Sequence, residues 1–130
     1  MATFKQRRRM AVNLLKRVRK RLSDRENWTK GEWARDAMGQ KIAATDEYAT
    51  CWCIGGAIAV EEKCLDVANH ICDLAEMMLR KTVYALTRRT STCSPIWYND
   101  LKKTTHRDIL DLLDITIKNA EDFNEEDEEV

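Results

Sequence analysis

The chain has 130 residues, 44% of them hydrophobic and 34% charged, and its equal numbers of basic and acidic side chains give a formal net charge of zero. Four glycines and one proline are too few for a low-complexity or collagen-like chain, and no apolar run reaches the roughly 20 residues that a membrane span needs. We therefore expect one helix-rich domain. The N-terminal segment shows no apolar signal sequence, so we expect reduced cysteines and a cytoplasmic location.

Apolar side chains recur at helical spacing in residues 9–22, which predicts an amphipathic first helix with a basic outer face. The period breaks over residues 23–46, which predicts an irregular insert with a short hairpin around residues 36–40. A second helix is expected over residues 50–63. Its small side chains, Gly55, Gly56 and Ala57, would let another backbone approach closely, a gain that must offset the roughly 1 kcal/mol cost of each helical glycine.

Asp66 is a candidate N-cap for a third helix that reaches about residue 87. Residues 88–103 are expected to form a loop, because Pro95 disfavours helical angles at the residue before it. The last helix is expected to begin at Thr105, where Asp108 completes a near capping box. The sequence thus predicts an all-α fold: a single-domain bundle of about four helices in residues 1–122, with the irregular insert between the first two helices, followed by an acidic, disordered tail in residues 123–130.

A polar and aromatic cluster is the strongest candidate site. Tryptophans near helix ends, together with Lys, Arg, Asp and His side chains, are typical of a surface that binds a protein partner or a small anionic ligand. The residues predicted to form this recognition surface are Trp28, Lys30, Arg35, Trp52, Asn99, Asp100 and His106. The structural alternative is that the tryptophans seal the ends of the bundle while Arg35 pairs with Asp36 or Asp100.

A cysteine-dependent hydrolase or transferase is one alternative function. In that hypothesis Cys53 or Cys51 lies near a helix N-terminus and is activated by His106. On a helix, Cys51 and Cys53 would point about 200° apart, and the other cysteines are scattered, so no metal site and no cofactor is predicted. Cys53, Cys64 and Cys72 instead fall on apolar stripes and are expected to pack in the core.

Nucleic-acid binding through the first helix is the second alternative, because the first 21 residues contain nine Lys or Arg side chains and no acid. The acidic C-terminal tail can occupy the same basic surface, and the basic stretch lacks the aromatic side chains that stack on bases. The pattern therefore favours a protein partner or a small anionic ligand over nucleic acid. It predicts no particular oligomeric state.

The segments NWTKGEWARDAMGQ, CWCIGGAI and WYNDLKKTTHRDILDLLDITI resemble a family of short uncharacterised proteins of bacteria and their phages. The shared motifs are W-T-K-G-x-x-A-R-D, W-C-x-x-G-A, W-N-D and T-H-x-D, and the resemblance covers residues 15–120. Tyr98 departs from the pattern, since it separates Trp97 from Asn99. The resemblance implies a shared fold and polar cluster without an activity. It also suggests a phage or mobile-element accessory factor, so the favoured hypothesis is a small non-enzymatic binding protein that binds a host protein or a small anionic ligand.

Overall fold

The computed structural model describes residues 3–89 and 93–129, with the backbone alone for residues 123–129. Its helices are α1 (Phe4–Arg21), α2 (Ile54–Leu65), α3 (Asn69–Thr87), α4 (Pro95–Asp100) and α5 (His106–Glu129), and a 3-10 turn, η1, covers Arg25–Asn27. Three two-residue strands, β1 (Ala34–Arg35), β2 (Lys41–Ile42) and β3 (Cys51–Trp52), form a small sheet. The fold is therefore mostly helical, as predicted, and the small sheet is an addition to the predicted helical bundle.

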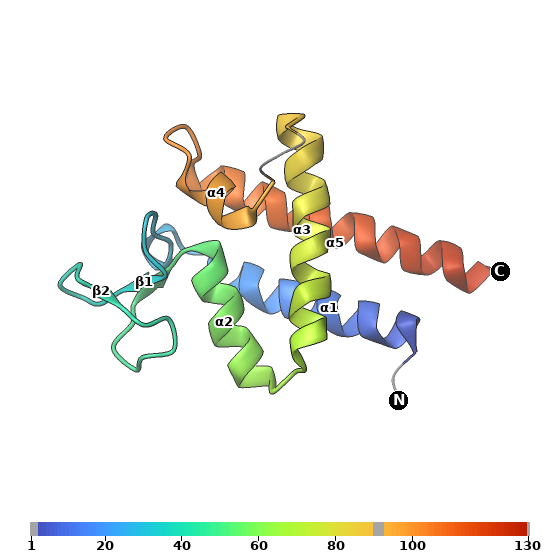
Figure 1. Cartoon of the computed structure of the whole chain (residues 1–130), viewed down its shortest axis with the longest axis horizontal. Helices are drawn as coiled ribbons and strands as arrows, with labels where there is room; N and C mark the ends of the chain where they lie inside the picture. The colour runs from blue at the N-terminus through green and yellow to red at the C-terminus, as the bar shows by residue number, and fades with distance from the viewer. Residues whose placement is uncertain (1–2, 90–92, 130) are drawn as a thin grey trace.

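The core forms where α1 packs against α2, α3 and α5. Figure 1 shows α3 crossing α1 and α5 at a steep angle. Burial of each large apolar side chain contributes about 1.5–3 kcal/mol. The fully buried side chains include Leu14, Leu15, Val18, Ile54, Ile71, Leu79, Ile109, Leu112 and Leu113. Within the described ranges, no helix combines the length and the apolar character needed to cross a bilayer.

α1 begins at Phe4, earlier than the start near residue 9 that periodicity predicts. Thr3 and Gln6 form a capping box: the Gln6 backbone N–H donates to the Thr3 hydroxyl at 3.1 Å, and the Thr3 backbone N–H donates to the Gln6 side chain at 2.8 Å. A capping box satisfies backbone donors that a helix start otherwise leaves unpaired. The first turn of α1 is therefore helical because of its cap, although no apolar stripe in the sequence predicts a helix there.

Two predicted boundaries of α2 and α3 are wrong. α2 begins at Ile54 instead of residue 50, because the two residues before Cys53 belong to β3. Asp66 is not the N-cap of α3; it is the C-cap of α2 and has a left-handed backbone with φ of 51°. A left-handed residue ends a helix, and aspartate tolerates this conformation better than most side chains. Ala68 takes the N-cap position of α3.

The segment after α3 contains a helix where a loop was predicted. The Ser94 hydroxyl accepts hydrogen bonds from the backbone N–H groups of Ile96 and Trp97, and Pro95 occupies the first helical turn, where its missing N–H costs nothing. These start signals produce the short helix α4. The predicted capping box of α5 is confirmed, since Thr105 and Asp108 exchange backbone-to-side-chain hydrogen bonds of 2.9 and 3.1 Å.

The C-terminal part of α5 overlaps the predicted acidic tail, since the helix continues to Glu129. The side chains of residues 123–130 lie outside the described part of the structure. Disorder of this tail, and the extent of the domain over residues 1–122, therefore stay predictions.

The insert folds as a three-stranded antiparallel sheet in the order β2-β1-β3. The predicted hairpin is confirmed: the Asp36 backbone N–H donates to the Gln40 carbonyl at 2.9 Å, and the Asp36 carboxylate accepts from the N–H groups of Met38 and Gln40. Gly39 has a φ of +80°, which this turn requires. The third strand, Cys51–Trp52, was not predicted. It ties the insert directly to the start of α2.

Gly56 explains how the insert reaches the helical core. A Cβ atom at Gly56 would overlap the carbonyl oxygen of Trp33, and that same oxygen accepts a hydrogen bond from the Cys53 backbone N–H at 3.2 Å. Gly56 and Ala57 are buried. The prediction that small side chains admit a neighbouring backbone is therefore confirmed, and the neighbour is the insert.

Candidate functional site

Asn99 lies at the centre of the predicted polar cluster, fully buried in α4. Its Oδ1 accepts hydrogen bonds from Trp28 Nε1 at 2.8 Å and from the Ile54 backbone N–H at 3.1 Å. Its Nδ2 donates to the Thr29 carbonyl at 3.1 Å and to Asp100 Oδ1 at 2.9 Å. A side-chain amide offers two donors and two acceptor positions, so Asn99 is saturated by its own protein.

Asp100 and Lys30 continue this junction between α4 and the insert. Asp100 Oδ1 also accepts from the Gly31 backbone N–H at 2.9 Å, and Lys30 Nζ donates to the Leu101 carbonyl at 2.7 Å. The ammonium group thereby satisfies a carbonyl at the C-terminal end of α4, where a positive charge is favourable. Asp100 therefore bonds to the backbone of the insert, and Lys30 of the insert bonds to the backbone at the end of α4.

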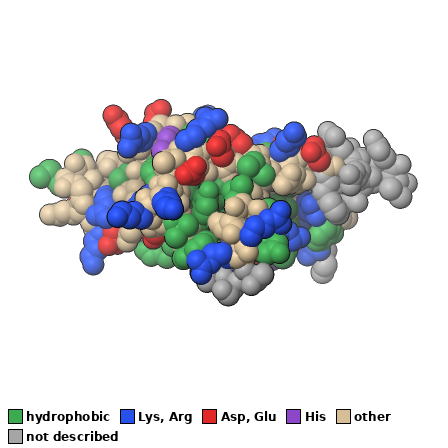
Figure 2. Space-filling view, turned by 90° about the horizontal axis from the view of Figure 1, so that it is seen from above, with side chains coloured by type: hydrophobic (Ala, Val, Ile, Leu, Met, Phe, Trp, Pro, Cys, Tyr) green, Lys and Arg blue, Asp and Glu red, His purple; other side chains and the backbone are tan. Residues whose placement is uncertain are grey.

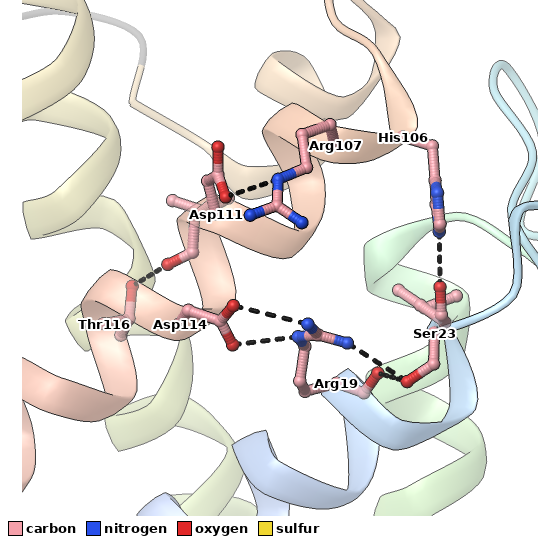
Figure 3. A network of polar contacts seen from close by, with 9 residues as sticks. Arg19, Ser23, His106, Arg107, Asp111, Asp114 and Thr116 are labelled. Carbon is pink, nitrogen blue, oxygen red and sulfur yellow. Dashed lines mark hydrogen bonds and ion pairs between the residues drawn. The ribbon is translucent and has the colours of Figure 1, made fainter.

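His106 joins the start of α5 to the end of α1. Its Nε2 lies 2.6 Å from the carbonyl oxygen of Leu22, which is the C-cap of α1. A carbonyl only accepts, so Nε2 carries the proton in this contact. Figure 3 shows this contact beside the Arg19–Asp114 ion pair, which also joins α1 to α5. The imidazole ring packs 5.9 Å from the Trp28 ring, between centroids.

We name Trp28, Lys30, Asn99, Asp100 and His106 the Asn99 cluster. These five of the seven predicted site residues come together at one junction. Their polar atoms bond to one another or to backbone groups, which is the arrangement expected of residues that seal the end of a bundle. The geometry therefore supports the structural alternative for this cluster, and ligand binding by it stays a prediction.

Arg35 lies beside the Asn99 cluster but works within the insert. Its guanidinium donates to the Thr29 hydroxyl at 3.0 Å, to the Gly39 carbonyl at 3.1 Å and to the Lys30 carbonyl at 3.3 Å. The expected ion pair with Asp36 or Asp100 does not form, because both carboxylates accept backbone N–H groups instead. Arg35 therefore fixes the shape of the insert.

Trp52, the seventh predicted residue, adjoins the Asn99 cluster through its backbone, which forms a β-bridge with Trp28, but its side chain lines a separate basic cleft. The cleft has a volume of about 560 Å³ and is lined by α1, α2 and the insert. Trp52 Nε1 donates to the Ala44 carbonyl at 2.9 Å, and the Arg21 guanidinium lies 4.6 Å from the centre of the Trp52 ring system. We define the basic cleft by the side chains of Arg17, Lys20, Arg21, Trp52 and Glu61.

Glu61 was missed by the sequence analysis. Its side chain is 4% exposed, and its two oxygens accept from Arg17 Nε at 2.8 Å and from Arg21 Nε at 2.5 Å. Glu61 follows Ala57 by one helical turn, so it shares the buried stripe of α2. An acid on a buried stripe opposite a basic helix is the sequence signal that would have predicted this ion-pair triad.

A second hollow, which we name the Trp33 groove, lies on the opposite side of α2. It has a volume of about 420 Å³ and is lined by α2, α3, α4 and the insert. Its apolar side chains are Trp33, Ile58, Pro95 and Ile96, and its acidic side chains are Glu62, Asp73 and Glu76. Trp33 is 53% exposed, although its backbone is locked against Gly56. The Trp33 ring lies over Gly55, so the groove presents a half-exposed aromatic side chain together with three carboxylates.

The contacts of the described residues give little support to a nucleophilic pair of Cys51 or Cys53 with His106, since Cys51 Sγ contacts the Arg35 carbonyl and His106 contacts another backbone group. Cys53 is buried at the N-cap of α2, where its Sγ accepts from the Gly56 N–H, and burial raises the pKa of this thiol. A catalytic thiol needs a lowered pKa. His106 Nε2 is committed to the Leu22 carbonyl. The expectation that Cys64 packs in the core is wrong, since Cys64 is exposed near the end of α2.

The basic outer face of α1 is largely matched by acids of the same chain. Lys16 pairs with Glu121 at 2.6 Å and Arg19 pairs with Asp114 at 2.8 Å, while Arg17 and Arg21 share Glu61. Figure 2 shows side chains of both signs interspersed on the face that it draws. A phosphate backbone is bound by an extended surface of one sign. This arrangement gives little support to nucleic-acid binding along α1.

Comparison with known sequences identifies one family. The profile described as "Family of unknown function (DUF6197)" matches residues 7–119. No curated protein and no solved structure matches the chain. Among the side chains that the structure describes, no group of three or more His, Cys, Asp or Glu residues is placed to hold a metal ion.

Proposed function

The chain belongs to DUF6197, a family of unknown function, and we propose that it is a non-enzymatic binding protein whose Trp33 groove holds a basic segment of a partner protein. The observation that carries this proposal is an exposed tryptophan in a groove that combines apolar side chains with three acids. Tryptophan is among the side chains that contribute most to binding when an interface buries them.

Charge defines the partner. The Trp33 groove is lined by three carboxylates, and its lining contains no Lys or Arg. Glu76 pairs with Arg80 in an exposed i,i+4 ion pair at 3.2 Å. The partner segment that complements this groove carries an apolar side chain to cover Trp33 and Lys or Arg side chains to meet the acids.

The Asn99 cluster supports this function by holding the groove in shape. It joins the insert to α4, and these two elements supply Trp33 and Ile96, whose side chains both lie against Gly55 in the groove lining. A groove that is already formed loses less conformational entropy when a partner binds. Most of the predicted recognition residues therefore act as positioning residues in this proposal.

In the setting implied by the resemblance, the protein is a phage or mobile-element accessory factor and the partner is a host protein in the cytoplasm. This context is part of the proposal. The basic, partly apolar partner segment is the feature that a search among host proteins would use.

The proposal is tested by capture of a host protein on immobilised wild-type protein, followed by purification of that protein and a binding titration. Trp33→Ala should weaken binding about tenfold or more, as expected for a central aromatic anchor. Tyr48→Ala is the matched control, because Tyr48 is an exposed aromatic side chain of the insert outside the groove lining. Equal loss in both variants, or no loss in Trp33→Ala, would contradict the proposal.

A further inference from the structure

We propose that the basic cleft is a binding site for the phosphate group of a small molecule. This site goes beyond the function proposed above, because it lies on the other side of α2 and shares no lining residue with the Trp33 groove. Its cations are Arg17, Lys20 and Arg21, which lie on one face of α1 at helical spacing.

The buried carboxylate of Glu61 orients two of these cations. It binds the Nε atoms of Arg17 and Arg21. Among the described residues, the hydrogen bonds of these two guanidinium groups are the Nε contacts to Glu61, and their Nη atoms make none. Glu61 thus holds each guanidinium group through its Nε atom, and the N–H donors on the Nη atoms are available for a ligand. Planar donors of this kind match the oxygens of a phosphate group.

Trp52 lines the cleft and positions one of its cations. The Arg21 guanidinium stacks over the Trp52 ring, and the ring is itself anchored through the hydrogen bond of Nε1 to the Ala44 carbonyl. Side chains that are fixed before a ligand arrives lose little entropy on binding. Trp52 is the apolar side chain of the cleft lining and can contact the organic part of the ligand.

Charge and size select the ligand class. Three cations and one carboxylate, 3 − 1, leave a local charge of +2. A phosphate monoester carries about −1.5 to −2 at neutral pH, whereas a single carboxylate carries only −1. The cleft volume of about 560 Å³ exceeds the space that a bare phosphate needs and falls in the range of small-molecule sites. The geometry therefore fits a phosphate group attached to a small organic body.

The test is a titration of the protein with inorganic phosphate and with pyrophosphate, followed by NMR of the four tryptophan indole N–H signals at constant ionic strength. Trp52→Phe assigns the Trp52 signal. We expect a saturable shift of that signal with both anions, tighter binding of pyrophosphate, and no saturable shift with chloride. A shift that does not saturate, or that chloride reproduces, would overturn the proposal.

Two lysine variants make the test specific. Lys20→Glu reverses one cleft charge at an exposed position, so the fold is kept, and it should weaken pyrophosphate binding about tenfold or more. Lys118→Glu makes the same change on the exposed face of α5 and should leave the affinity unchanged. Equal effects of both variants would show general charge screening and would refute the site. Tighter binding of duplex DNA, with steep salt dependence, would refute it in favour of a nucleic-acid backbone.

Discussion

Removal of the Asn99 amide is expected to loosen the insert and lower the free energy of unfolding. Asn99→Ala leaves the buried Ile54 backbone N–H without its acceptor, at a cost of about 1–3 kcal/mol. Three further hydrogen bonds, to half-buried or exposed partners, are each worth about 0.5–1.5 kcal/mol, and water replaces part of this. We expect a total loss of about 3–5 kcal/mol, measured by urea denaturation with tryptophan fluorescence.

Two further variants separate the hydrogen bonds from the shape of the side chain. Asn99→Asp keeps the size and both acceptor contacts, but its second oxygen would face the Thr29 carbonyl and the Asp100 carboxylate. It should therefore be destabilised at neutral pH and recover in part in acid, where the introduced carboxyl is protonated. Asn13→Ala, at an exposed position of α1, should change stability by less than about 0.5 kcal/mol. An Asn99→Ala variant as stable as Asn13→Ala would refute the reasoning.

Three other outcomes follow from the packing and from the thiols. Gly56→Ala should destabilise by about 1–3 kcal/mol or more in urea denaturation, since its Cβ meets the Trp33 backbone, whereas Gly55→Ala meets side chains that can move and should cost less. Cys64 should react with a thiol reagent at neutral pH well before Cys53 or Cys72, and labelling of all three at the same rate would contradict the burial assigned to them. Burial raises the pKa of Cys72 from 9.0 to about 12, so unfolded protein loses this proton first and stability should fall from pH 9 toward pH 12, whereas Cys72→Ala should show a weaker fall.

The long helices could be predicted because each carries its own apolar period. α1, α3 and α5 present buried stripes over several turns, and their sequence signal is local. The helix α4 has six residues, too few to show a helical period of apolar side chains. Its sequence signals are the N-cap Ser94 and Pro95 in the first turn. Strands of two residues show no alternation either. β3 exists because Trp52 and Cys51 pair with β1, a tertiary contact that no local pattern encodes.

The convergence of the candidate residues could be predicted better than their roles. The placement of tryptophan, Asn, Asp and His near predicted helix ends suggests that seven residues meet, and five of them lie at one junction in the structure. Whether their polar atoms face a ligand or one another depends on distances of a few ångströms. Glu61 and Trp33 line the two hollows but were not predicted as site residues. Glu61 is a buried acid, and Trp33 is an exposed aromatic side chain. Residue type alone suggests the opposite burial for each.

The most direct test of the proposed function maps where a basic partner segment contacts the protein. A synthetic helical peptide of Lys and Leu serves as the probe, and backbone and indole N–H signals are followed by NMR. The account predicts saturable shifts of the Trp33 indole and of the Ile58 and Ile96 amides, all in the groove. Shifts confined to the basic cleft, or equal binding of a peptide of Glu and Leu, would contradict the proposed function.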